Sequence, residues 1–170
     1  MNTIEDAVHR YSALLYRLAL AKTGNIHDAQ DITQEVFYKL LRAENAGKVF
    51  DDEEHRKAWL IRVAVNAGKS LVGSAFKRGY SGEIDERVSG DVSGTDDAVS
   101  RLETRETVRP AVLSLPEKYR VIIHLFYYED MGIDGISKVT GLGVNTVKSR
   151  LHRARNMLRE KLREVDFDDF

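Results

Sequence analysis

A run of basic and polar residues near the carboxyl terminus has the spacing of one face of an α-helix. At about 100° per residue, one side of residues 144–163 carries Asn145, Lys148, Ser149, His152 and Arg153, and the opposite side carries Val144, Val147, Leu151, Ala154, Leu158 and Leu162. Lysine and arginine donate hydrogen bonds to guanine acceptors, and serine or asparagine pairs with several base edges. The pattern predicts a helix that rests on a domain through its apolar face and enters a DNA major groove with the other.

The residues before this helix support the same prediction. Residues 133–140 are predicted to form a short helix, and Gly141 and Gly143 supply a turn before residue 144. The two helices would form a helix-turn-helix. A basic helix face is often only solvated, so the face alone leaves that alternative open.

Charge is segregated along the chain although the formal net charge is only -1. Residues 56–78 hold six basic side chains and no acid, and residues 144–163 are also strongly basic. Between them, residues 83–106 carry eight acids against three arginines. Two basic surfaces joined by an acidic connector favour a nucleic-acid partner more than the net charge does.

Several classes of protein are excluded by what the sequence lacks. There is no cysteine, and the five histidines do not have the spacing of a metal site. Asp28, Asp31 and Glu35 share a helix face, but no further ligand lies in register with them. No nucleophile with a supporting base and no phosphate-binding glycine loop is found. We therefore expect no catalytic activity, no cofactor, no metal and no small-molecule substrate.

The periodicity of apolar residues predicts an all-α protein of two small helical domains. Helices are expected at residues 4–23, 27–42, 56–77, 98–113, 116–129, 133–140 and 144–163. Residues 44–55 are expected to form a loop, and Gly68 and Gly73 to bend the third helix. Residues 79–97 are rich in Gly, Ser and acid and predict a flexible linker between domains 1–78 and 98–170.

No apolar stretch could span a bilayer and no secretory signal is present, so the expected location is cytoplasmic, without membrane insertion.

Four segments in this order resemble the extracytoplasmic-function (ECF) sigma factors of bacterial RNA polymerase. They are DAQDITQEVFYKLLR (28–42), HRKAWLIRVAVNAGKSLV (55–72), LPEKYRVIIHLFYYEDM (115–131) and VNTVKSRLHRARNMLREKL (144–162). The resemblance implies a sigma-two-like helical bundle and a sigma-four-like helix-turn-helix domain. It also implies a protein that binds core RNA polymerase and promoter DNA, recognises the minus-ten and minus-thirty-five elements, assists promoter melting and is regulated by an anti-sigma factor.

The resemblance also implies roles for individual residues. For the minus-thirty-five element these are Asn145, Lys148, Ser149, His152 and Arg153, with Arg150 and Arg155 near phosphates. For the minus-ten element they are Asn66, whose family counterpart helps to hold a flipped-out base, together with Arg62, Lys69 and Lys77 on the same helix and Phe50 in the loop. For docking on the polymerase they are Asp28, Asp31, Gln34, Glu35 and Phe37.

Rival interpretations explain less of the sequence. A free-standing helix-turn-helix regulator would explain residues 132–163. It would leave residues 28–37 and 56–66 without a functional role. A small recombinase would need a nucleophilic serine or tyrosine in an arginine cluster, whereas Tyr11, Tyr16 and Tyr38 are interpreted as core residues from their helical spacing. Two roles for the acidic linker remain open: its negative charge mimics RNA, or it is a passive tether between the domains.

Overall fold

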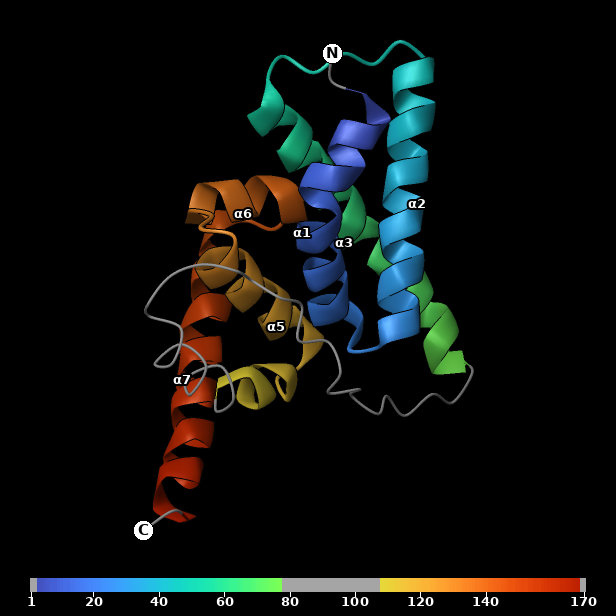
Figure 1. The fold of residues 1–170 in the computed structure, drawn as a ribbon. Helices are drawn as coiled ribbons and strands as arrows, with labels where there is room; N and C mark the ends of the chain where they lie inside the picture. The colour runs from blue at the N-terminus through green and yellow to red at the C-terminus, as the bar shows by residue number, and fades with distance from the viewer. Residues whose placement is uncertain (1–2, 78–107, 169–170) are drawn as a thin grey trace, which may run out of the picture.

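The computed structural model describes residues 3–77 and 108–168, which form helices without a strand in these ranges (Figure 1). The elements are α1 (Ile4–Thr23), α2 (Ile26–Asn45), α3 (Glu53–Lys77), α5 (Glu117–Ile123), the π-helical turn η1 (His124–Tyr128), α6 (Ile133–Thr140) and α7 (Val144–Asp168). Residues 108–113 are also helical. The all-α prediction is confirmed, while the predicted linker and residues 98–107 lie outside the described residues.

The boundary between α1 and α2 follows from local backbone chemistry. Thr3 and Asp6 form a reciprocal capping box at the start of α1. Gly24 ends that helix in the left-handed conformation, with φ 66°, which glycine adopts without a steric cost, and its N–H donates to the Leu20 carbonyl. The Asn25 side chain then accepts from the third residue of α2. The chain therefore reverses over a very short corner, which sets α2 beside α1.

The first three helices pack on one another around large aliphatic side chains. Leu15, Leu18, Ile32, Leu40 and Leu60 are all 0% exposed. Burying one such side chain stabilises the fold by about 1.5–3 kcal/mol. This core fixes α3 relative to α2, and each of these two helices keeps one polar side outward.

A polar network ties the start of α3 to the other two helices. The Tyr11 hydroxyl donates to Glu53 Oε2, which also lies 3.1 Å from Arg10 Nη1. Arg56, which is 3% exposed, donates through Nη2 to Glu44 Oε1 at 2.7 Å. The hydrogen bond from Tyr11 is the largest cause that lowers the pKa of Glu53.

The elements differ from the sequence prediction in several places, and α7 runs to Asp168, beyond the predicted end at residue 163. The loop covers only residues 46–52, because Glu53 begins α3 within the polar network and acids are favoured in a first helical turn. No helix break occurs at Gly68 or Gly73, since α3 continues as one helix to Lys77; the alternative of a bend there stays a prediction. The single helix expected at 116–129 changes to a π-helical turn at His124, whose Nε2 lies 3.1 Å from the buried Glu129 Oε1.

The remaining helices form a second group that lies directly against the first (Figure 1). Within it, α5 packs between α1 and α7, and α6 packs against α3. Arg120 of α5 donates from Nε to the Ala21 carbonyl at 2.6 Å and from Nη2 to the Lys22 carbonyl at 3.1 Å. Buried apolar residues of both groups belong to one continuous core.

Replacing Glu53 by Gln tests the network at the start of α3. Because the folded chain lowers the pKa of Glu53 below its ordinary value of 4.5, the charged form stabilises the fold above that pH and loses this effect as the pH falls through the lowered value. We expect Glu53→Gln to destabilise the chain by about 1 kcal/mol at neutral pH in urea unfolding, and by less at about pH 3.5. The exposed neighbour Glu54→Gln is the control, and an equal loss at both pH values would contradict the assignment.

Candidate nucleic-acid interface

The turn between α6 and α7 is built by backbone and hydroxyl hydrogen bonds. Gly141 has φ 75°, and its N–H donates to the Ser137 carbonyl at 3.0 Å. Ser137 Oγ donates to the Leu142 carbonyl at 2.6 Å, which closes the turn from the other side. The predicted glycine turn is confirmed at Gly141, whereas Gly143 does not have a left-handed backbone.

The apolar stripe of α7 holds this helix on the rest of the fold. Val147, Leu151 and Ala154 are buried, Leu158 and Leu162 are half-buried, and only Val144, at the first turn, is exposed. Because the stripe faces the core, the opposite side of α7 must face solvent. The predicted division of the helix is therefore confirmed.

Five predicted minus-thirty-five residues come together on this outward side. Asn145, Lys148, Ser149, His152 and Arg153 are all exposed. His152 Nε2 lies 3.3 Å from Asn156 Nδ2, so its ring is oriented by a neighbour one turn away. A hydrogen bond with Arg153 lowers the pKa of the Tyr119 phenol, which places the guanidinium beside α5. We name these five residues the reading face.

The two predicted phosphate contacts flank the reading face instead of joining it. Arg155 Nε donates to the Tyr127 hydroxyl at 2.6 Å, and its guanidinium lies 5.1 Å from the centre of the Phe126 ring. Arg150, on the other flank, is half-buried and lines a pocket with Val65 of α3. Both arginines are thus engaged with other elements of the chain.

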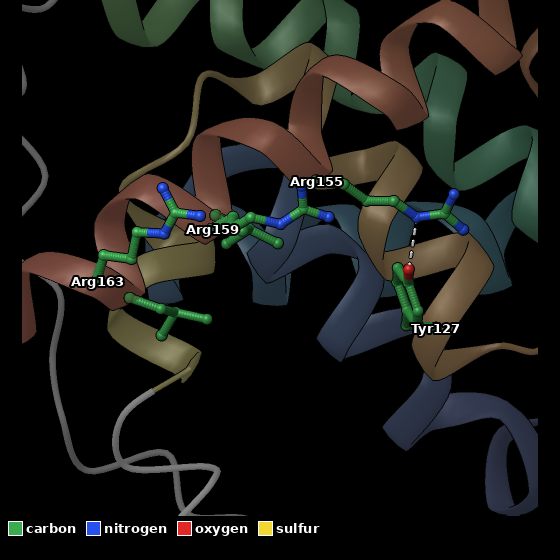
Figure 2. Close-up of a pocket in the computed structure, with 6 residues that line it drawn as sticks. Tyr127, Arg155, Arg159 and Arg163 are labelled. Atoms are coloured by element: carbon green, nitrogen blue, oxygen red, sulfur yellow. Dashed lines mark hydrogen bonds between the residues drawn. The ribbon is translucent and has the colours of Figure 1, made fainter. Parts of the chain in front are cut away.

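The outer half of α7 lines a shallow groove that the sequence did not reveal. Figure 2 shows Arg155, Arg159 and Arg163 spaced along α7, with Tyr127 of η1 bonded to the first of them. Leu158 and Leu162 complete the lining. Tyr127 is 51% exposed and could be found only once η1 is known to lie beside α7.

On α3, the structure describes two of the four predicted minus-ten side chains. Arg62 and Asn66 are both exposed, and they lie one turn apart. Arg62 Nη2 donates to the Lys138 carbonyl of α6 at 2.9 Å, so it already has a partner in this arrangement. The side chains of Lys69 and Lys77 lie outside the described residues, although the backbone there is helical.

Phe50, the predicted minus-ten residue in the loop 46–52, packs against Trp59 of α3. Its ring is half-buried and packs edge-on against Trp59, with ring centres 5.6 Å apart. Lys48 Nζ lies 5.3 Å from the centre of the Phe50 ring. Val49 is 81% exposed and forms the tip of the loop. Lys48 and Val49 therefore extend further into solvent than Phe50.

The predicted docking residues of α2 differ in exposure, and Phe37 packs against the core. Asp31 and Gln34 are exposed, and Asp28, Glu35 and Phe37 are half-buried.

The outward side of α2 also carries two large apolar residues. Tyr38 is 59% exposed and Leu41 is 39% exposed. The interpretation of Tyr38 as a core residue is wrong. At 100° per residue it falls opposite the buried Ile32, Val36 and Leu40, a signal that the sequence already contained.

Other kinds of site are not supported by the described part of the chain. No group of three or more His, Asp or Glu side chains within residues 3–77 and 108–168 could hold a metal ion. Over the same ranges, no helix combines the length and the apolar content needed to cross a bilayer.

Two family descriptions match the chain, "Sigma-70 region 2" over residues 7–75 and "Sigma-70, region 4" over residues 105–158. The ECF RNA polymerase sigma factor SigW of Bacillus subtilis is 33% identical over 94% of this chain and 89% of its own length. The ECF RNA polymerase sigma factor SigL of Mycobacterium tuberculosis is 33% identical over 91% and 86%.

A solved structure shares the fold. It is the sigma factor RpoE of Bartonella quintana in complex with the anti-sigma factor NepR, with a TM-score of 0.68 and 21% identity, covering 94% of this chain and 96% of that chain. The matches to both sigma-70 regions and the identity to SigW over nearly the full chain lead to one conclusion: this chain belongs to the ECF sigma factors of bacterial RNA polymerase.

Proposed function

We propose that this sigma factor docks on core RNA polymerase through α2, contacts the minus-ten element with α3 and the loop 46–52, and contacts the minus-thirty-five element with the reading face of α7. The observation that carries the proposal is the division of α7, since its apolar stripe is buried and its five polar residues are exposed together. The chain would act as a specificity subunit, with no catalytic activity of its own. A free-standing regulator is not favoured, because the match to sigma-70 region 2 would then have no role.

The domain limits form part of the proposal. We assign residues 1–78 to polymerase docking and the minus-ten element, 79–97 to a linker and 98–170 to the minus-thirty-five element. The family matches over residues 7–75 and 105–158 fall within the two outer parts.

For the minus-thirty-five element, the chemistry of the reading face matches a major groove. Lys148 and Arg153 offer charged donors for guanine, and Asn145 and Ser149 offer side chains that pair with several base edges. His152, oriented by Asn156, adds a ring nitrogen at the same level of the helix. These contacts specify sequence, while nearby arginines on the flanks of the helix neutralise phosphate charge.

For the minus-ten element, Asn66 is the central residue. Its exposed amide carries both a donor and an acceptor, which is what a pocket for an unpaired base edge requires. The loop tip formed by Lys48 and Val49 would contact the displaced strand, with Phe50 and Trp59 supporting it from below.

For polymerase docking, α2 offers acids around an exposed aromatic ring. Asp31 and Glu35 would meet basic groups of the polymerase and steer its approach. Tyr38 adds apolar area at the same face, as aromatic residues do at the centre of many interfaces.

An anti-sigma factor is a further proposed partner. The solved relative RpoE was crystallised with the anti-sigma factor NepR, and a comparable partner would cover the basic surfaces of this chain. We place the protein in the cytoplasm, where core polymerase and promoter DNA are found.

Replacing Arg153 by Ala tests the reading face. Loss of one good base contact weakens recognition by about 1–3 kcal/mol, so run-off transcription with core polymerase should fall most on promoters that depend on the upstream element. Arg17→Ala, an exposed arginine on α1, is the matched control. Because Arg153 also touches Tyr119, Tyr119→Phe is the second control and should transcribe normally. If Tyr119→Phe loses as much transcription as Arg153→Ala, the role of Arg153 is structural.

Replacing Asn66 by Ala tests the minus-ten assignment. The variant should bind core polymerase normally but open the promoter more slowly, because the unpaired base loses its hydrogen-bonding partner. Permanganate footprinting of unpaired thymines over time measures this step. A promoter with a pre-melted minus-ten bubble should restore the rate, and an unchanged opening rate on duplex DNA would remove Asn66 from the site.

Replacing Asp31 by Lys tests the docking face. Reversing one charged contact that contributes about 1.4 kcal/mol weakens binding to core polymerase about tenfold. Fluorescence titration of labelled chain with core polymerase measures the change. Glu160→Lys makes the same charge change on α7 and should leave the affinity unchanged; equal losses in both variants would show a general charge effect.

A further inference from the structure

Arg155 of α7 is held in place by two consecutive aromatic residues of η1. Its Nε donates to the Tyr127 hydroxyl at 2.6 Å. Its guanidinium lies 5.1 Å from the centre of the Phe126 ring and 5.6 Å from the centre of the Tyr127 ring. The two rings meet edge to face, with centres 4.9 Å apart, and Phe126 packs against the core. The guanidinium therefore has a fixed position although Arg155 is exposed.

The hydrogen bond between Arg155 and Tyr127 leaves donors of both side chains unused. An arginine carries N–H donors on Nε and on both terminal nitrogens, and only Nε is bonded to Tyr127 (Figure 2). The hydroxyl accepts this bond, so its own O–H can still donate. Among the described side chains, none accepts from the terminal nitrogens of Arg155 or from this O–H. The pair therefore presents donors to a ligand that has several acceptor oxygens.

The surroundings of the pair attract an anion. Tyr127 and Arg155 line the shallow groove along the outer half of α7 together with Arg159 and Arg163, and no acid among the described residues lines it. Positive charges that gather in one groove raise the local concentration of negatively charged groups. The ligand of the pair is therefore expected to carry a negative charge as well as acceptor oxygens.

The position of Arg155 on α7 indicates which anion this is. Arg155 follows Lys148 of the reading face by seven residues, which is about 10 Å along the helix and about 20° around it. A side chain in the middle of a face that enters the major groove meets base edges, whereas one at the border of that face meets the phosphates along the groove. The location favours a DNA phosphate over a carboxylate of a protein partner.

We propose that Tyr127 and Arg155 form a phosphate clamp, which binds one backbone phosphate at the border of the minus-thirty-five element. The terminal nitrogens of Arg155 donate to the phosphate oxygens, as the planar fork of a guanidinium allows. Tyr127 donates to the same phosphate and keeps Nε in place, so it is both a contact and a positioning residue. The clamp rests on the proposed function, because it needs the reading face to lie in the major groove.

The clamp gives the chain a fixed register on the duplex. Phosphate contacts carry no sequence information themselves, but they set which bases a recognition helix reaches. Because the two rings order Arg155 before DNA arrives, little side-chain freedom is lost on binding. The clamp thus anchors α7 while the reading face selects the sequence.

The test measures promoter binding by the full chain assembled with core polymerase. Each phosphate around the minus-thirty-five element is replaced, one at a time, by a neutral methylphosphonate. We expect one position at which the unmodified chain loses affinity at least about tenfold, the size of a hydrogen bond to a charged group. Arg155→Ala should abolish this penalty. Tyr127→Phe, which keeps the ring, should reduce it by roughly threefold.

Matched variants separate the clamp from a merely structural contact. Tyr128→Phe makes the same change at the next residue, whose ring stacks on His124, and should keep the full penalty. Arg155→Ala should lower the slope of log affinity against log salt by about one, whereas Arg155→Lys, which keeps the charge, should preserve the slope. A residue that only stabilises the fold would weaken binding to every duplex and leave the penalty at the single phosphate unchanged.

Three outcomes overturn the clamp. One is a full penalty that persists in Arg155→Ala, and another is a full penalty that persists in Tyr127→Phe. The third is a loss of affinity for core polymerase in both variants with the DNA penalty intact, since the donors would then bind an acidic group of the polymerase. The proposed function fails in a different way: no phosphate around the minus-thirty-five element is then sensitive in the unmodified chain, and Arg153→Ala changes no base preference.

Discussion

The carbonyl groups at the end of α1 need hydrogen-bond donors. The side chain that supplies these donors also fixes how the two helical groups pack on each other. The last carbonyls of a helix have no partner within it. Here Arg120 reaches across from α5 to two of them, Ala21 and Lys22. Burial lowers the pKa of this guanidinium, yet arginine remains charged because its ordinary pKa is so high. One side chain thus satisfies a helix end, anchors α5 and joins the two helical groups.

The helices and their inward faces could be predicted because periodicity is a local property. Residues 4–23 and 133–140 were expected as helices and are α1 and α6. The stripe Val147, Leu151 and Ala154 was expected to be buried and is. The spacing of apolar residues contains the required information, and Gly24 and Gly141 mark the ends of α1 and α6.

Contacts between distant segments could not be predicted in the same way. Arg155 was expected near phosphate, and nothing local to it indicated that its Nε also donates to the hydroxyl of Tyr127, a residue 28 positions earlier in the chain. Arg120 and Ala21 are 99 positions apart, and nothing local to either residue indicates the pairing. The sequence reveals which side chains face outward, whereas the tertiary fold decides which of those are already occupied.

The π-helical turn η1 has a consequence for the way related chains align. Its hydrogen bonds span five residues, as from the Glu129 N–H to the His124 carbonyl, so this turn at the end of α5 is wider than an α-helical turn. Within this turn, the Tyr127 hydroxyl accepts from Arg155 Nε of α7 at 2.6 Å. A relative that ends this helix with an ordinary α-helical turn would offer a different side chain to Arg155 of α7.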